Sequence, residues 1–463
     1  MAPGALTTTA LHSDDAATSP TKTAAAALEA AIARFQTRNP RSQELHQLAL
    51  SSMPGGNTRA QMYTFPFPVC MKSGQGYQVT SEDGHVYTDM VGELTAGLYG
   101  HSHPIIKETI TNTLTTIGLN LGATTAQEHI HAAAICERFA LERVRFCNSG
   151  TEANLYALHA ARAFINNDDT RREGGRRNKV VAFSGGYHGG VFTFANGTPG
   201  PGTVDRDDWV VAEFNDSESA RRAIGSEGVA ACLVEGMQGS AGAVAGTQEF
   251  MKTVEAACKE NGVLFILDEV MTSRLAPGGL AELYNLQPDL KTMGKYLGGG
   301  LAFGAFGGRA DIMAVFDPRP DALHPMHLPH HGTFNNNTLA MHAGHAGLTK
   351  AYTPALCNAL NAQGDWLRAQ LAALTAGTNM CFTGVGAVLG SHFTTQGLQV
   401  LHRDMDEDWT LKQLFWFEMM EEGFWLTRRG IYALILGTPQ SELERFVDCV
   451  AAFLERHREL VQV

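Results

Sequence analysis

Short apolar runs that alternate with helix-like segments constrain this chain more than any other feature of its sequence. From about residue 105, runs of four or five mostly apolar residues recur between stretches with helical spacing. We expect these runs to be strands at 144–147, 179–183, 230–234, 263–267 and 303–307. Strands this apolar, separated by helices, are typical of a mainly parallel sheet that is covered on both faces. The sequence therefore predicts an α/β fold, in which ligands bind at the carboxyl ends of the strands.

The two ends of the chain differ from this middle part. Residues 24–50 have helical spacing, and residues 69–91 alternate in the way that short antiparallel strands do. The chain after about residue 338 is helical and then mixed. We expect the two ends to form a smaller second domain together.

The expected domain limits follow from these changes of pattern. A large domain is predicted over residues 96–345, and the smaller domain is predicted to contain 23–95 and 346–463. Residues 1–22 are rich in Ala, Thr and Ser, so we expect them to be a disordered tail.

Composition excludes several classes of function. The formal net charge of −12 argues against a general nucleic-acid-binding surface, which would be basic. No stretch approaches the roughly 20 apolar residues of a membrane span, and the N-terminus lacks the apolar core of a signal peptide and the arginines of a transit peptide. The eight cysteines form no CxxC pair and no cluster with zinc spacing, which is typical of free thiols in a reducing compartment. We therefore expect a cytoplasmic protein that binds no metal, nucleic acid or membrane.

Lys295 and Asp268 carry the most chemical information. Lys295 stands in Gly-Lys-Tyr-Leu-Gly-Gly-Gly (294–300), where its backbone is held tightly and its amine can reach a carbonyl. Asp268 ends the apolar run at 263–267, and a carboxylate at the end of a buried strand needs a cationic partner. An enzyme that uses pyridoxal phosphate (PLP) requires both, an amine for a Schiff base and an acid against the pyridine nitrogen. The alternative, a metal site at Asp268 and Glu269, is weaker because no matching His or acidic set occurs at regular spacing.

Two segments could bind the phosphate group of such a cofactor. Ser149, Gly150 and Thr151 join a predicted strand to a predicted helix. A helix N-terminus offers unpaired N–H groups and partial positive charge, which suits a phosphate, although an ordinary helix cap would contain the same residues. Thr333, in Gly-Thr-Phe-Asn-Asn-Asn (332–337), is a second candidate.

Three further side chains could contact the cofactor ring or the substrate. Tyr187 has glycines on both sides, so it has room to lie flat on a planar ring or simply to pack in a turn. Arg59 follows a Pro-Gly-Gly-Asn turn, and Arg429 precedes Gly430. Each arginine could bind a substrate carboxylate through two hydrogen bonds, or could be an ordinary surface residue.

Together these motifs resemble the class III, fold-type I PLP aminotransferases. The resemblance extends from about residue 40 to the C-terminus and is carried by the segments 53–59, 95–101, 148–154, 184–190, 234–239, 267–274, 294–300 and 332–337. Within this family the chain is similar to the branch that contains glutamate-1-semialdehyde aminomutase and the β-amino acid (β-phenylalanine) aminotransferases. Two departures favour the β-amino acid enzymes. The aminomutase usually has Thr-Gly-Phe-Arg where this chain has Thr-Ser-Arg (272–274), and a Thr-Leu-Ser-Gly-Asn-Pro-like segment where this chain has Thr-Phe-Asn-Asn-Asn (333–337).

The resemblance implies a fold and a role for each candidate residue. The fold would be that of a fold-type I PLP-dependent transferase, with a mainly parallel seven-stranded sheet between helices and a smaller α/β domain built from both termini. Lys295 would form the Schiff base and move the proton, and Asp268 would pair with the pyridine nitrogen. The phosphate would be held by Ser149, Gly150 and Thr151, with Tyr187 stacked on the ring.

The resemblance also implies partners and substrates. Thr333 would bind the phosphate in the neighbouring subunit, which requires a homodimer. Arg59 would hold the carboxylate of a β-amino acid, and Arg429 that of an α-amino or α-keto acid. The implied activity is a ping-pong transfer of the amino group from a β-amino acid, or a related amine, to 2-oxoglutarate or pyruvate. The alternatives are the aminomutase, which releases no keto acid between its half-reactions, and a non-catalytic PLP-fold protein, against which the intact Lys295 and Asp268 argue.

Overall fold

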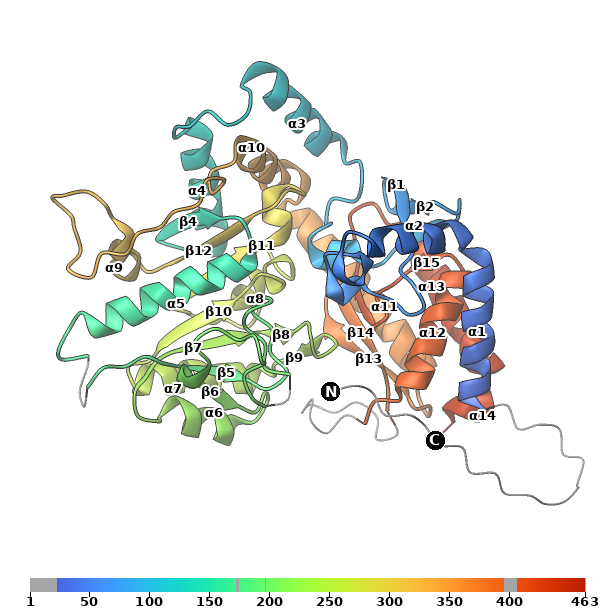
Figure 1. The fold of residues 1–463 in the computed structure, drawn as a ribbon. Coiled ribbons are helices and arrows are strands. Elements are labelled where there is room, and N and C mark those ends of the chain that lie inside the picture. The colour runs from blue at the N-terminus through green and yellow to red at the C-terminus, as the bar shows by residue number, and fades with distance from the viewer. Residues whose placement is uncertain (1–22, 172–174, 196, 395–405, 463) are drawn as a thin grey trace, which may run out of the picture.

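A seven-stranded sheet forms the centre of the structure, a computed structural model that describes residues 23–171, 175–195, 197–394 and 406–462 (Figure 1). In spatial order its strands are β4 (Arg143–Cys147), β12 (Gly304–Gly308), β11 (Leu290–Gly294), β10 (Leu264–Asp268), β7 (Val229–Glu235), β5 (Lys179–Phe183) and β6 (Trp209–Ala212). Strand β12 is antiparallel to both of its neighbours, and all other neighbours are parallel. The mainly parallel sheet predicted from the sequence is confirmed, while the tail predicted at residues 1–22 lies outside the described residues.

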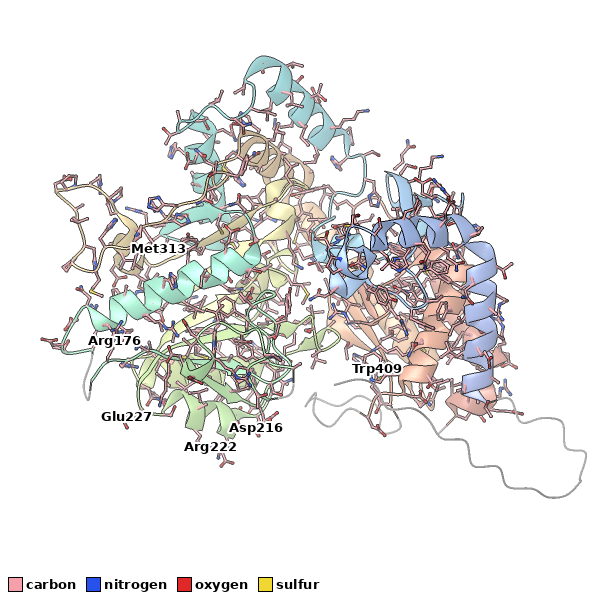
Figure 2. The ribbon with its side chains drawn as sticks, in the orientation of Figure 1. Arg176, Asp216, Arg222, Glu227, Met313 and Trp409 are labelled. Atoms are coloured by element: carbon pink, nitrogen blue, oxygen red, sulfur yellow. The ribbon has the colours of Figure 1, made fainter. Side chains whose placement is uncertain are left out.

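Alternate side chains of the inner strands pack into two separate cores. The helices along the central part of the chain are α3 (Pro104–Thr116), α4 (Ala126–Phe139), α5 (Gly150–Asn166), α6 (Ser217–Ile224), α7 (Gln248–Glu260), α8 (Gly279–Leu283), α9 (Ala310–Met313) and α10 (Thr338–Ala346). Leu233 and Ile266 pack with side chains of α5, whereas Val234 and Leu267 pack with side chains of α6 and α7. On the outer side of α6, Arg222 points away from the molecule (Figure 2). Both faces of the sheet are therefore covered, as the apolar strand runs predict.

The helix that follows β4 begins at the edge of the sheet where the site lies. Ser149 is the N-cap of α5, and its hydroxyl accepts a hydrogen bond from the backbone N–H of Glu152 at 3.2 Å. Strand β4 points in the same direction as β10 and β7, because two antiparallel pairings separate it from β11. The N-terminus of α5 consequently lies at the carboxyl edge of the sheet.

Two strands of the sheet were not predicted from their sequences. Strand β6 has only four residues and lies at the edge of the sheet. Strand β11 contains two polar residues, yet all of its side chains are buried. Lys291 donates to the carbonyl oxygen of Phe139 at 2.8 Å, and Thr292 donates to the side-chain oxygen of Asn154 at 2.7 Å. Because these polar groups have partners inside the protein, β11 is buried without an apolar sequence.

Elements from both ends of the chain lie side by side (blue and red in Figure 1). They comprise α1 (Ala24–Arg38), α2 (Pro40–Leu50), β1 (Met71–Gln75), β2 (Gln78–Ser81), β3 (Val86–Asp89), α11 (Pro354–Leu374), β13 (Met380–Val385), β14 (Val388–Phe393), α12 (Trp409–Glu421), β15 (Phe424–Trp425), β16 (Ile431–Ala433), α13 (Gln440–Arg456) and α14 (Arg458–Val461). Strand β15 pairs with β3, and Arg34 of α1 forms an ion pair of 2.8 Å with Glu421 of α12. The predicted helix at 24–50 is two helices, since Pro40 starts a new one. The domain limits proposed above stay a prediction.

The helices of the described residues also bear on membrane insertion. Among them, no helix is both long enough and apolar enough to cross a membrane.

Candidate active site

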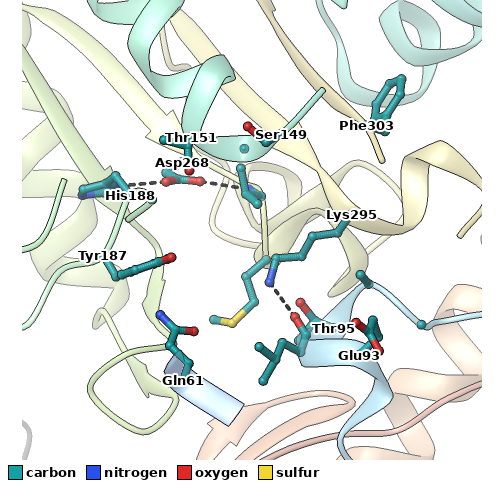
Figure 3. A pocket seen from close by; sticks show the side chains of 18 of the residues that line it. Gln61, Glu93, Thr95, Ser149, Thr151, Tyr187, His188, Asp268, Lys295 and Phe303 are labelled. Carbon is teal, nitrogen blue, oxygen red and sulfur yellow. Dashed lines mark hydrogen bonds and ion pairs between the residues drawn. The ribbon is translucent and has the colours of Figure 1, made fainter. Parts of the chain in front are cut away.

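A cavity of about 720 Å³ lies where β5, β7 and β10 end (Figure 3). Seven of the residues predicted from the sequence line it: Ser149, Gly150, Thr151, Tyr187, Asp268, Lys295 and Arg429. Two predicted residues, Arg59 and Thr333, are not among its lining residues. The terminal segments contribute part of the wall, through Gln61 and Ile431 among others.

Lys295 enters the cavity directly from the end of β11. Its backbone has φ +57°, a left-handed conformation that is uncommon outside glycine. Its amine donates to the carbonyl oxygen of Leu94 at 2.5 Å. In Figure 3, Lys295 and Tyr187 extend into the cavity from opposite sides.

The surroundings of Lys295 increase the neutral fraction of its amine. Burial lowers the pKa of this amine to about 8. The carboxylates of Asp268 and Glu235 oppose this pKa shift, and the positive charges of Arg274 and Arg429 reinforce it. A larger fraction of the amine is therefore neutral near pH 7 than for a lysine in water, and only the neutral amine can attack a carbonyl.

Asp268 is held in one orientation at the end of β10. Its Oδ2 atom accepts hydrogen bonds from the amide of Asn154 and from Nδ1 of His188, each at 2.8 Å. Its Oδ1 atom accepts from the backbone N–H of Val270 at 3.0 Å. The hydrogen bond from Thr292 fixes the Asn154 amide in turn, so four different segments position this carboxylate.

Glu235 is a second buried carboxylate at the same edge. It ends β7 and is the direct neighbour of Asp268 in the sheet register. Its two oxygens accept from the backbone N–H groups of Tyr187 at 2.8 Å and Gly239 at 3.2 Å. Burial raises the pKa of Glu235 to about 7. Glu235 thus fixes the loop that presents Tyr187.

The N-terminus of α5 and the loop after β5 meet closely. Gly189 has φ +121°, and a Cβ atom at this position would lie 2.7 Å from the Cβ of Thr151. Only glycine permits this conformation and this approach together. The first residues of α5 and the loop at Gly189 therefore line the cavity side by side.

The two predicted arginines differ sharply in their surroundings. Arg429 lines the cavity, and its Nη2 atom lies 3.4 Å from Gln61 Oε1. Its Nε atom is buried and has no hydrogen-bond partner among the residues that the structure describes. In the described part of the chain, no carboxylate lies within ion-pair distance of Arg429. Arg59 instead forms an ion pair with Glu93, and the two side chains are 55% and 57% exposed.

Thr333 lies outside the cavity of its own chain. Its side chain is exposed, and its loop contacts the site through Asn335, which accepts a hydrogen bond from Asn148 at 3.0 Å. The predicted role of Thr333 in a neighbouring subunit stays a prediction.

Four residues of the site had no predicted role: Asn154, His188, Glu235 and Glu93. Asn154 and His188 belong to the same strand-end motifs as Ser149 and Tyr187. Glu235 and Asp268 each end an apolar run, and the two runs are neighbouring strands. This shared position at a strand end was the sequence signal that could have identified Glu235. No local signal points to Glu93.

Comparison with known proteins gives a consistent family. The sequence profile of the family Aminotransferase class-III matches residues 60–430. The chain is 46% identical to an uncharacterized aminotransferase of Schizosaccharomyces pombe and 42% identical to a β-phenylalanine transaminase of Variovorax paradoxus; each alignment covers 94% of this chain and 97% of the relative. It is 32% identical to a glutamate-1-semialdehyde 2,1-aminomutase of Chloroherpeton thalassium, over 87% of this chain and 94% of the relative.

A solved structure agrees with these sequence matches. The crystal structure of a β-phenylalanine aminotransferase from Variovorax paradoxus superposes with a TM-score of 0.90 at 42% identity, over 95% of this chain and 99% of that one. The fold-type I architecture predicted from the sequence is thereby confirmed. The chain belongs to the class III aminotransferases, which are PLP-dependent enzymes.

Proposed function

We propose that this aminotransferase moves the amino group of a β-amino acid, or a related amine, to 2-oxoglutarate or pyruvate. The observation that carries the proposal is the guanidinium of Arg429, which faces the same cavity as Lys295 with a buried, unpartnered Nε atom. A buried donor without a partner is costly, and a substrate carboxylate would satisfy it. The similarity to the β-phenylalanine transaminase of Variovorax paradoxus supports a β-amino acid as donor.

The residues of the cavity fit PLP. The first N–H groups of α5, together with the hydroxyls of Ser149 and Thr151, suit its phosphate. Glycine at position 189 lets the loop after β5 approach Thr151 more closely than a residue with a Cβ atom could, so that both segments line the same part of the cavity. We assign Tyr187 to the face of the ring, Asp268 to the ring nitrogen and Lys295 to the aldehyde carbon.

Each residue then has a defined task. Bound PLP supplies an aldehyde that takes up the amino group and a ring that withdraws electrons from the substrate carbon. Lys295 Nζ removes the proton from the carbon that carries the amino group and returns it later, for which a lowered pKa of about 8 is suited. Asp268 keeps a proton on the ring nitrogen, and its three hydrogen bonds hold it in place for this task.

The two arginines would serve substrates whose carboxylates differ in distance from the reacting carbon. We assign the β-amino acid carboxylate to Arg59 and that of the α-keto acid to Arg429. Arg59 must exchange the carboxylate of Glu93 for that of the substrate. This exchange is feasible because an exposed ion pair contributes only about 0–1 kcal/mol.

We further propose a homodimer in the cytoplasm. Thr333 is exposed and lies outside its own cavity, as a residue that completes the neighbouring site must be. All eight cysteines are free thiols, which supports a reducing compartment. Sedimentation of the PLP-loaded enzyme at assay concentration tests the assembly, and a fully active monomer would exclude it.

A half-reaction screen tests the proposed activity. The PLP-loaded enzyme is mixed with a β-amino acid, an α-amino acid or a simple amine, without an acceptor. We expect the β-amino acid to discharge the visible absorbance of bound PLP and to release a stoichiometric keto product. Discharge only by glutamate-1-semialdehyde, without a released keto acid, would identify the aminomutase instead.

A further inference from the structure

Arg274 is a buried cation to which the proposed chemistry assigns no task. It ends a short 3-10 turn (Thr272–Arg274) after β10 and is 0% exposed. Within the described ranges, no carboxylate lies within ion-pair distance of its guanidinium, and its Nε atom has no hydrogen-bond partner. A buried and uncompensated charge is costly, so its contacts require an explanation.

The guanidinium joins two segments that are far apart in the sequence. Its Nη1 atom donates to the carbonyl oxygen of Thr95 at 3.3 Å, and its Nη2 atom donates to the carbonyl oxygen of Leu434. Leu434 directly follows β16, whereas Thr95 belongs to the segment that covers Lys295. Arg274 therefore ties the wall of the cavity to the C-terminal sheet.

The segment that Arg274 holds has an unusual conformation. Four successive residues, Gly92–Thr95, have φ values between +50° and +76°, and only the first of them is glycine. A left-handed backbone is unfavourable for side chains with a Cβ atom, so other contacts must maintain it. This turn presents the carbonyl oxygen of Leu94, which accepts the hydrogen bond from the Lys295 amine.

The backbone of Arg274 is itself anchored from the other side. Its carbonyl oxygen accepts hydrogen bonds from the hydroxyl of Tyr352 at 2.7 Å and from the amide of Asn361 at 2.9 Å. The guanidinium is thus placed by α11 and its preceding turn, independently of the left-handed segment. Because the Arg274 backbone is held independently of the turn at Gly92–Thr95, its guanidinium can fix the position of that turn.

We propose that Arg274 is a positioning residue for Lys295: its guanidinium holds the left-handed turn at Gly92–Thr95, and thereby the carbonyl oxygen against which the lysine amine rests. The proposal relies on the proposed role of Lys295 as the lysine that binds PLP.

Electrostatics supports the same link. Burial is the main cause of the lowered pKa of Lys295, and the charge of Arg274 contributes in the same direction. The other charged groups that act on this pKa are Asp268 and Glu235, which raise it, and Arg429, which lowers it. Around Arg274 itself the titratable groups are Tyr99, Tyr296, Tyr352 and Cys357, whose effects oppose the lowering of its pKa by burial. Loss of the Arg274 charge should therefore make protonation at the Lys295 nitrogen easier.

Two substitutions separate the hydrogen bonds from the charge. Arg274→Gln removes the charge and one donor arm, and Arg274→Lys keeps a charge but lacks the planar fork that reaches two carbonyl oxygens. Thr375→Val is the matched control, because it removes a buried hydrogen bond, from the Thr375 hydroxyl to the carbonyl oxygen of Leu371 at the other end of α11, and leaves every contact of Arg274 unchanged. Each PLP-loaded variant is characterised by its thermal midpoint, by kcat and KM, and by the pH at which the visible absorbance of bound PLP changes.

We expect Arg274→Gln to move this spectral midpoint upward by roughly half to one pH unit and to lower kcat about tenfold, with little change in KM. Arg274→Lys should keep the midpoint and still lower kcat about tenfold, since the turn is no longer held at two points. Thr375→Val should change the thermal midpoint alone. If Arg274→Gln lowers only the thermal midpoint and keeps the wild-type kcat and spectral midpoint, Arg274 supports the fold and does not position Lys295.

A second variant covers the case in which the Arg274 variants do not fold. Gly92→Ala disturbs the same turn from its other side, because the new Cβ would lie 2.8 Å from the carbonyl oxygen of Ala433. A lower kcat with a shifted spectral midpoint supports the proposal, and wild-type values of both overturn it. Borohydride reduction and peptide mapping of the wild-type enzyme test the role of Lys295 separately. A failure of the Lys295 assignment can therefore be distinguished from a failure of the Arg274 proposal.

Discussion

Arg429→Ala should impair the acceptor half-reaction far more than Arg59→Ala impairs the donor half-reaction. The reason is the difference in their present partners. Arg429 has a buried Nε atom without a partner and contacts Gln61 only at 3.4 Å, so a substrate carboxylate adds a new charge-assisted interaction. Such an interaction contributes about 1.5–3 kcal/mol, which corresponds to roughly 10- to 150-fold in KM.

Arg59 is expected to contribute less to substrate binding, because its guanidinium already forms an ion pair with Glu93. Both side chains of this ion pair are more than half exposed, at 55% and 57%. The substrate carboxylate therefore replaces one exposed partner by another, and the net gain is at most about 1 kcal/mol, or roughly fivefold. From the sequence alone, both arginines would be assigned equal effects.

Stopped-flow measurements can follow each half-reaction separately. Loss of the visible absorbance of bound PLP reports the donor step, and its recovery with 2-oxoglutarate or pyruvate reports the acceptor step. Arg428→Ala is the matched control, because Arg428 contacts Gln413 and does not line the cavity. If Arg429→Ala affects the acceptor step no more than Arg428→Ala does, or if Arg59 and Arg429 affect the same step equally, the two-site assignment is wrong.

Four further predictions concern the same cavity. Glu93→Gln frees Arg59 and should lower the KM for a β-amino acid up to about fivefold, while a simple amine donor, measured in parallel, should show no change. Asp268→Ala should fold and bind PLP but transaminate at least about 100-fold more slowly, because the ring nitrogen loses its acidic partner; near-normal turnover would remove Asp268 from this role. Lys295→Ala should leave no borohydride-reducible adduct of PLP. In the PLP-free protein, Lys295→Met should raise the free energy of unfolding by up to about 3 kcal/mol below pH 8, since the pKa falls from 10.5 to about 8 and each pKa unit corresponds to about 1.4 kcal/mol. As pH rises, Lys295 loses its proton in the folded state before it does so in the unfolded state, so the stability difference between Lys295→Met and wild type should disappear by about pH 10.5. Urea unfolding at pH 7 and pH 10.5 measures this difference. The same difference at both pH values would show that the lysine charge is not its cause.

Much of the architecture could be predicted because its causes are local. Strands β7 and β10 are buried along their whole length, so their sequences are continuously apolar. Asp268 stands out against that background as a polar residue at a strand end. Lys295 stands out because glycines surround it. Strand β11 escaped prediction because hydrogen bonds inside the protein satisfy Lys291 and Thr292, and such partners cannot be identified from a local pattern.

The residues that position Asp268 could not be found in this way. The amide of Asn154 is 114 residues from Asp268 in the sequence, and His188 is 80 residues away. Their contact depends on the order β11-β10-β7-β5 in the sheet, which brings separate strand ends together. Sequence motifs identified the segments that contain these residues, but only the strand order shows which atoms meet.

The site also contains the places where local rules of folding are broken. Leu94 and Lys295 have left-handed backbones, Glu235 is a buried carboxylate, and Arg429 retains a buried atom without a hydrogen bond. Each of these features is unfavourable in isolation, and the two extensive cores on either side of the sheet offset their cost. Two of these groups face the cavity with donors that a ligand could engage, the buried Nε atom of Arg429 and the amine of Lys295. Sequence patterns record the favourable choices that build the sheet, whereas the unfavourable ones are defined only by the surrounding structure, and a ligand that pairs with these two donors would offset part of their cost.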